Sequence, residues 1–173
     1  AARGCGIFIV HARKAWLKGL SPKENREVPP LNYQRVYQLK RDFPVLTILI
    51  NGGIQSLAEV RTHLVHTDGV MLGRTAYHEP YRLAELEHAL FGTPLPDRMA
   101  LIRQMREYTE RHLAEGGKLN HISRHLLGLF QGLPGARGWR RHLSENAHRD
   151  NADWGVVERA LASIHEPVRV PAA

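Results

Sequence analysis

Short apolar runs alternate with amphipathic segments in the first half of the chain. The runs at Ile7–Val10, Leu46–Ile50 and Val70–Leu72 are mostly apolar over a few residues, which is typical of buried strands. Between them, apolar residues recur at helical spacing in Asn32–Phe43, and Ser56–Val65 begins with a Ser-x-x-Glu capping box. Strands that alternate with single helices predict right-handed crossovers and a parallel sheet.

The pattern changes after Pro80, because only helical spacing is visible from there on. The expected helices are a long one from Asp97 to Gly116, a second one carrying Ile122, Leu126, Leu129 and Phe130, and two more over Arg137–Ala147 and Asp153–Ile164. The predicted domains are therefore residues 1–85, with strands and helices, and residues 86–165, which are helical. Residues 166–173 are expected to form a frayed tail.

The charge balance of the chain is strongly basic. It holds 24 Lys and Arg residues against 17 Asp and Glu, a formal charge of +7 before its 11 histidines are counted. Such a charge favours a polyanionic partner, most often nucleic acid, although composition alone is equally compatible with a protein that is merely basic.

The single cysteine limits the chemistry of the chain. Cys5 alone excludes an internal disulfide and a cysteine-based zinc site, which fits a reducing cytoplasm, and no metal site is expected. Because Cys5 precedes the first strand, we interpret it as a small core residue. No apolar run is long enough to cross a membrane, and the N-terminal run lacks the cleavage site of a signal peptide.

All three expected strands end in residues suited to binding a phosphate. In parallel sheets ligands meet the carboxyl ends of the strands, and glycines there let the backbone approach phosphate oxygens beside a positive charge. Each residue also has a plain structural explanation, as a tight turn, a core histidine or a solvated arginine. Together they predict a site for a phosphate-bearing cofactor, and they are His11, Asn51, Gly52, Gly53, Gly73 and Arg74.

Five longer motifs contain or extend these strand ends. They are His-Ala-Arg-Lys-Ala-Trp-Leu at 11–17, Leu-Ser-Pro-Lys-Glu-Asn-Arg at 20–26, Ile-Asn-Gly-Gly-Ile at 50–54, Asp-Gly-Val-Met-Leu-Gly-Arg at 68–74 and Gln-Gly-Leu-Pro-Gly-Ala-Arg-Gly-Trp-Arg-Arg at 131–141. In this order they closely resemble the C-terminal half of tRNA-dihydrouridine synthases of the bacterial A subfamily. The resemblance implies an α/β fold, the C-terminal part of a TIM (β/α)8 barrel that binds FMN, followed by an all-α helical tRNA-binding domain.

The resemblance also implies an activity. The family reduces the C5–C6 double bond of uridine in tRNA with FMN, which NADPH reduces, and the A subfamily acts on uridines 20 and 20a of the D-loop. His11 would contact the flavin, Asn51, Gly52 and Gly53 would hold the phosphate and ribityl region, and Gly73 and Arg74 would close the phosphate site. The family's proton-donating cysteine belongs to the N-terminal half of the barrel, and Cys5 does not match it. No catalytic residue is therefore expected in the chain, which alone should be inactive.

Four basic residues are implied to contact tRNA. Lys23 and Arg26 would meet it beside the active site, and Arg137 and Arg140, three residues apart, would share one helix face in the helical domain. Folded RNA is held mainly through its phosphates, while the target base leaves its stack to reach the pocket. The nearby Trp139 could stack on a base, but packing is its more common role. We expect a cytoplasmic monomer.

Two other functions stay open at this point. One is an RNA-binding module without catalysis, and the sequence upstream of Ala1 would distinguish it from the enzyme. The other is a different FMN-dependent barrel oxidoreductase that acts on a small molecule, since many chemistries share this fold and phosphate site. The cluster of Arg137, Arg140 and Arg141 argues against it, because such a reductase has no use for a basic helical region.

Overall fold

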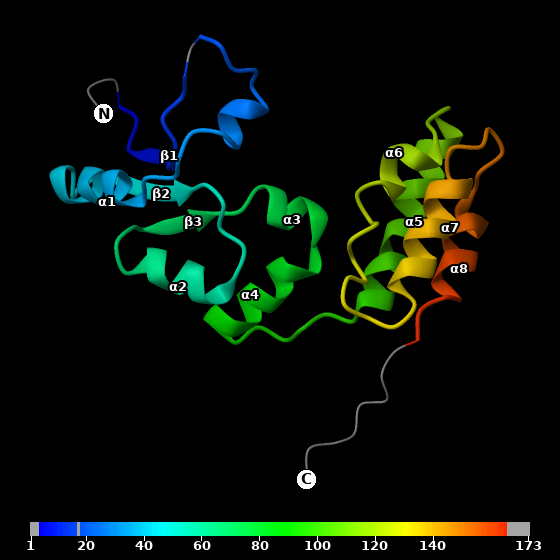
Figure 1. Cartoon of the computed structure of the whole chain (residues 1–173). Helices are drawn as coiled ribbons and strands as arrows, with labels where there is room; N and C mark the ends of the chain where they lie inside the picture. Colours follow the sequence, from blue (N-terminus) through cyan, green and yellow to red (C-terminus); the bar gives the residue numbers. More distant parts are fainter. Residues whose placement is uncertain (1–3, 17, 166–173) are drawn as a thin grey trace. The chain divides into compact units, whose positions relative to one another are not determined.

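The computed structural model describes residues 4–16 and 18–165 and divides the chain into two compact units (Figure 1). The first unit is Ala1–Thr75 and the second is Ala76–Ala173. The division lies before the expected domain boundary between residues 85 and 86, which falls inside a helix that the sequence pattern did not predict, α4 (Tyr81–Phe91). The expected tail, 166–173, lies outside the described residues.

The first unit is an α/β structure built on a parallel sheet, as predicted. Its regular elements are β1 (Ile7–His11), the 3-10 helix η1 (Glu24–Arg26), α1 (Tyr33–Asp42), β2 (Thr47–Asn51), α2 (Leu57–Leu64) and β3 (Gly69–Met71). The strands are ordered β1-β2-β3 and both pairs are parallel. In the observed register His11 pairs with Asn51, and Asn51 with Met71, so the three strands end side by side.

Capping side chains explain where the helices of this unit begin. The Asn32 side chain accepts a hydrogen bond from the backbone N–H of Arg35 at 3.1 Å, which starts α1. The predicted capping box of α2 is present, because Ser56 Oγ accepts from the N–H of Glu59 at 3.3 Å and Glu59 Oε2 accepts from the N–H of Ser56 at 2.8 Å. These two helices therefore begin where the sequence indicated.

The sheet is covered unevenly within the described residues. Ile48 and Ile50 of β2 are buried, together with Val36 of α1 and Val60 of α2. By contrast, Ile7 and Ile9 of the edge strand β1 are 66% and 58% exposed. An edge strand with exposed branched apolar side chains is an association surface unless something covers it.

The predicted burial of Cys5 is wrong. The residue is exposed, and its Sγ donates to the carbonyl oxygen of Ile7 at 3.3 Å. It precedes the exposed edge strand β1, so no core surrounds it in the described part of the chain.

The second unit is helical in its described residues. The short helix α3 (Arg74–His78) crosses the division, and α4, α5 (Arg98–Ala114), α6 (Leu119–Ser123), α7 (Ala136–Asn146) and α8 (Trp154–Leu161) follow, the last four lying together in Figure 1. Their core is centred on Trp139, which is 0% exposed, meets the ring of Phe130 edge-on at 5.0 Å between centroids, and donates through Nε1 to the carbonyl oxygen of Leu126 at 3.1 Å. Trp139 therefore packs in the core, where no base can stack on it.

The second of the predicted helices is shorter than expected. It ends as α6 at Ser123, and turns follow, although Leu129 and Phe130 still enter the core. Gly128 lies in this turn segment, where a Cβ would collide with the carbonyl group of His78. The close backbone approach requires a glycine at this position.

Two exposed arginines of α5 form ion pairs on the surface. Arg106 binds Glu110 at 2.8 Å and Glu158 at 3.3 Å, and Arg111 binds Glu107 at 2.8 Å, all between side-chain nitrogen and oxygen atoms. Pairs at this i,i+4 spacing stabilise a helix modestly. Within residues 4–16 and 18–165, no helix has the length and apolar character needed to cross a membrane.

A buried imidazole joins the two helices of the first unit. The Tyr37 hydroxyl of α1 lies 2.7 Å from His63 Nδ1 of α2, and the Tyr33 ring meets the His63 ring at 4.4 Å between centroids. Burial lowers the pKa of His63, the Glu59 carboxylate opposes this shift, and the neighbouring His66 adds to it.

This geometry predicts acid-sensitive packing of the first unit. In the unfolded chain His63 binds a proton near pH 6.5, whereas in the folded state its depressed pKa keeps the ring neutral to lower pH. The free energy of unfolding should thus fall as the pH drops below about 6.5, and His63→Gln should flatten that dependence in urea denaturation. If the free energy of unfolding of His63→Gln depends on pH as steeply as that of the wild type, other groups cause the pH dependence.

Candidate functional site

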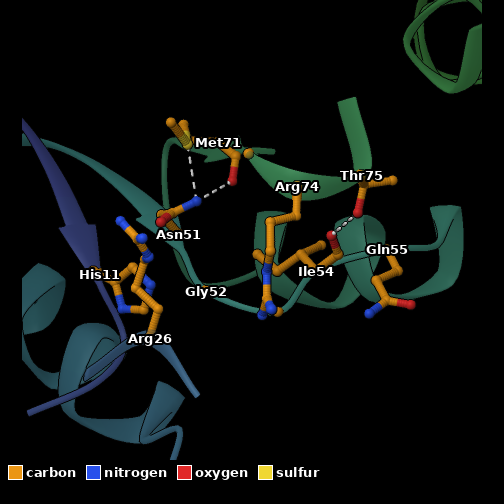
Figure 2. A pocket seen from close by; sticks show the side chains of 11 residues that line it. His11, Arg26, Asn51, Gly52, Ile54, Gln55, Met71, Arg74 and Thr75 are labelled. Carbon is orange, nitrogen blue, oxygen red and sulfur yellow. Dashed lines mark hydrogen bonds between the residues drawn. The ribbon is translucent and has the colours of Figure 1, made fainter. Parts of the chain in front are cut away.

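The carboxyl ends of the three strands surround one cavity of about 120 Å³ (Figure 2). All six residues predicted to bind the cofactor line it, and so do five others; the complete lining is His11, Arg26, Asn51, Gly52, Gly53, Ile54, Gln55, Met71, Gly73, Arg74 and Thr75. The parallel register brings them together, because it aligns the end of each strand with the end of its neighbour.

The loop after β2 has no room for side chains. Gly52 and Gly53 have φ angles of +129° and +71°, and a Cβ on either would lie 2.8 Å from the Leu31 side chain. The Tyr33 hydroxyl donates to the carbonyl oxygen of Gly52 at 2.8 Å and fixes the loop. Backbone atoms of the glycines therefore line the cavity, which is the form of a phosphate-binding turn.

Hydrogen bonds of two side chains join the segments around the cavity. Asn51 Nδ2 donates to the carbonyl oxygen of Met71 at 2.7 Å and lies 2.9 Å from Met71 Sδ, which links β2 to β3. Thr75 Oγ1 donates to the carbonyl oxygen of Ile54 at 2.9 Å, which links the start of α3 to the glycine loop. Figure 2 shows both links at the rim of the cavity. The cavity is therefore held by polar contacts of its own residues.

The electrostatic field of the cavity is positive. Arg26 and Arg74 contribute side chains from the β1–α1 loop and from the start of α3. Partial burial of the His11 ring lowers its pKa, and the charges of Arg13, Arg74 and Arg26 lower it further. His11 is therefore neutral at pH 7 and binds through hydrogen bonds or ring contact, while the arginines supply the charge that an anion needs.

One carboxylate contacts an arginine of the cavity. Glu27 Oε1 lies 3.4 Å from Arg74 Nη1, and both side chains are more than a third exposed. Such an exposed pair is weak and screened by solvent, so the Arg74 guanidinium can exchange partners at low cost.

The loop between β1 and α1, residues 12–31, is folded by its own polar contacts. Arg13 Nη1 donates to the carbonyl oxygens of Pro29 and Glu27, the latter at 3.2 Å, and Arg13 also bridges Leu31 through the backbone. Asn25 Oδ1 accepts from the N–H of Trp16 at 2.7 Å, and its Nδ2 donates back to the carbonyl oxygen of Trp16 at 3.0 Å. Arg13 thus has a structural role. These hydrogen bonds fix the conformation of the loop that carries the other cations.

The first pair of predicted tRNA contacts occupies two positions on this loop. Arg26 lines the cavity together with His11. Lys23 does not line it and is exposed at the start of η1.

The second pair lies on α7. Arg137 is exposed, and Arg140 donates through Nη1 to Gln131 Oε1 at 2.6 Å. Among the described residues neither arginine forms an ion pair, in contrast to Arg106 and Arg111 of α5. Their charge is therefore available to an anionic partner.

Some residues of the site escaped the sequence analysis. Gln55 and Thr75 adjoin predicted residues, so extending each motif by a residue or two would have found them. Leu31 and Tyr33, which shape the glycine loop, lie far from any strand end in the sequence. No pattern marks them, because their position depends on how the β1–α1 loop folds back.

Comparison with known proteins identifies the family. The family model described as Dihydrouridine synthase (Dus) matches residues 1–165. The chain belongs to the dihydrouridine synthase family.

Several relatives of this dihydrouridine synthase chain are named tRNA-dihydrouridine(20/20a) synthase. The one from Shewanella oneidensis is 62% identical over 165 residues, 94% of this chain and 49% of the relative. The one from Vibrio cholerae is 60% identical over 163 residues, 93% of this chain and 50% of the relative. The Escherichia coli K12 protein is 62% identical over 162 residues, 92% of this chain and 47% of the relative. The chain spans about half the length of the curated relatives it matches.

The glycines of the cavity allow a matched test. Gly52→Ala should destabilise the fold by about 1–3 kcal/mol, since it places a Cβ at a positive φ and against Leu31. Gly73→Ala should change stability by less than about 1 kcal/mol, because nothing lies within 4 Å of its Cβ and its φ is not positive. Urea denaturation of both variants compares them; equal losses would contradict the described loop geometry.

Proposed function

We propose that the chain is the C-terminal half of a tRNA-dihydrouridine synthase that uses FMN to reduce the C5–C6 double bond of uridines 20 and 20a, with NADPH as the reductant. One observation supports it most strongly: His11, Asn51, Gly52, Gly53, Gly73 and Arg74, from three separate strand ends, line a single cationic cavity. The family match and the names of the relatives supply the reaction class.

The cavity fits the phosphate end of FMN. Gly52 and Gly53 offer backbone atoms at close approach, and Gly73 leaves open space beside Arg74. Arg26 and Arg74 balance the negative charge of a phosphate, which can displace the weak Glu27 contact from Arg74. In this assignment Asn51 faces the ribityl chain and His11 the flavin ring.

When bound, FMN would supply the hydride for the uracil ring. The residues of this chain would bind and orient the cofactor and keep His11 uncharged beside it. The proton for the second uracil carbon is assigned to a cysteine of the upstream half of the barrel. Cys5 is exposed ahead of β1, away from the carboxyl ends of the strands, and has no part in this step.

The exposed edge of β1 supports the assignment to a half barrel. Ile7 and Ile9 are uncovered in the described residues, although their strand belongs to a parallel sheet, a kind that is normally covered on both faces. Upstream strands of the closed (β/α)8 barrel would pair with this edge. The helices of the second unit then follow the last strand as the family's helical domain.

The tRNA is assigned to two groups of cations. Lys23 and Arg26 lie on the β1–α1 loop, with Arg26 at the cavity itself, where a uridine turned out of its stack must arrive. Arg137 and Arg140 supply unpaired charge on α7. We place this protein in the cytoplasm as a monomer, where tRNA and NADPH are available.

Flavin content tests the cofactor assignment. The full-length protein should purify yellow with FMN, and Arg74→Ala should weaken FMN affinity at least about tenfold, because a charge-assisted phosphate contact is lost. The exposed Arg35→Ala is the matched control and should retain its flavin. NADPH-dependent dihydrouridine formation in unmodified tRNA completes the test. A colourless protein that cannot be reconstituted with FMN would refute the proposed function.

Salt dependence tests the proposed tRNA face. Replacing Arg137 and Arg140 by alanine should weaken tRNA binding and flatten the plot of log K against log [salt] by about 0.7–0.9 for each lost phosphate contact. The control is Arg111→Ala, whose guanidinium is already paired with Glu107. Equal salt slopes for the double variant and the wild type would count against contacts between α7 and RNA.

A further inference from the structure

One tryptophan of the chain is exposed while the other two are buried. Trp16, on the loop between β1 and α1, is 45% exposed, whereas Trp139 and Trp154 of the helical unit are 0% and 5% exposed. Within residues 4–16 and 18–165, the Trp16 side chain forms no hydrogen bond and no ring contact. It is not part of the cavity lining, and it is not among the four predicted tRNA contacts. A large aromatic surface is therefore open to solvent in the described part of the chain.

The backbone of Trp16 is held in place although its ring has no partner. Asn25 Oδ1 accepts from the N–H of Trp16 at 2.7 Å, and Asn25 Nδ2 donates to the carbonyl oxygen of Trp16 at 3.0 Å. The same Nδ2 lies 3.4 Å from the carbonyl oxygens of Leu20 and Ser21. A tryptophan has only two side-chain torsions, so on a fixed backbone it loses little conformational entropy when it binds a partner.

Asn25 also places Trp16 beside the predicted tRNA contacts of this loop. It belongs to η1 and stands between Lys23 and Arg26 in the sequence. Arg26 lines the cavity at the strand ends. Because the Asn25 side chain binds the Trp16 backbone directly, Trp16 lies next to the segment that is assigned to RNA near the cavity.

The charge of the loop around Trp16 is mostly positive. Lys14 and Lys18 are exposed, and in the described part of the chain neither forms an ion pair. The two carboxylates of the loop already have partners, since Glu24 accepts from a backbone N–H at 2.7 Å and Glu27 pairs with an arginine at 3.4 Å. Proteins hold unpaired RNA bases in this way, by stacking them on an aromatic ring while nearby cations bind phosphates. The loop therefore fits single-stranded RNA better than an apolar protein surface.

The proposed reaction leaves a base that needs a new stacking partner. The target uridine must leave its stack to reach the cavity that Arg26 lines. Its departure uncovers one face of each neighbouring base. The wide π face of an indole can cover such a face without reading the identity of the base.

We propose that the Trp16 indole stacks on an unpaired base that flanks the target uridine in the bound tRNA. Lys14 and Lys18 would bind phosphates near that base. Trp16 is a binding residue and not a catalytic one, because it lies outside the lining of the cavity. This inference rests on the proposed function, because it takes tRNA as the ligand.

Three substitutions of Trp16 in the full-length protein test the stacking. Trp16→Ala should weaken tRNA binding at least about fivefold, the lower end of the loss expected for one base stack. The slope of log K against log [salt] should stay at the wild-type value, since no charge is removed. Trp16→Phe keeps an aromatic ring and should retain most of the affinity, whereas Trp16→Leu is apolar without a ring and should lose as much as Trp16→Ala.

Phe43→Ala is the matched control. Phe43 is an aromatic residue of the same unit with a similar exposed fraction, 48%. It follows α1 and precedes β2, which places it near the amino end of the strand, opposite the end that forms the cavity. Its removal should change neither the affinity for tRNA nor the salt slope.

Urea denaturation and FMN content show whether the ring instead packs against the upstream half of the protein. Both should match the wild type in all three Trp16 variants, since an exposed ring contributes little to the fold. The stacking would be overturned, with the proposed function intact, by wild-type tRNA affinity in Trp16→Ala or by equal affinities of Trp16→Phe and Trp16→Leu. A loss of stability that parallels the loss of binding would overturn it as well. A wild-type protein that does not bind tRNA would instead refute the proposed function.

Discussion

The site depends on the parallel register of three strands. Pairing of His11 with Asn51, and of Asn51 with Met71, sets the strand ends abreast at one edge of the sheet. A slip of one residue would turn Ile48 and Ile50 out of the core and rotate Asn51 away from the carbonyl oxygen of Met71. The hydrophobic pattern that buries β2 therefore also sets the register that brings the residues of the cavity together.

The arginines of the chain differ in whether local groups already bind them. Arg106 and Arg111 of α5 are paired with nearby glutamates, and Arg13 is bound to backbone carbonyl groups. Arg137 and Arg140 keep their charge available, as do Lys23 and Arg26 within the described residues. Net charge alone could not make this distinction, because it counts all cations alike. The local carboxylates decide which surface can attract a polyanion.

The sequence predicted the parallel sheet, the capping box of α2 and the convergence of the six strand-end residues. These features follow from local patterns, since burial, capping and strand ends each leave a mark within a few residues. It could not predict the exposure of Cys5, the short α6 or the role of Leu31 beneath the glycine loop. The position of Leu31 depends on a contact with Gly52 and Gly53, which are distant in the sequence, and the exposure of Cys5 depends on what packs around β1. The roles of Lys23, Arg137 and Arg140 toward RNA stay predictions.

The uncovered edge of β1 has a consequence for biosynthesis. Exposed Ile7 and Ile9 on an open strand favour edge-to-edge association with other chains. In the proposed whole protein the upstream half of the barrel leaves the ribosome first, so β1 meets its neighbouring strand as soon as it emerges. The order of translation then protects the most aggregation-prone surface of this half. Separate synthesis of the two halves would remove that protection and place β1 in competition with every other open strand in the cell.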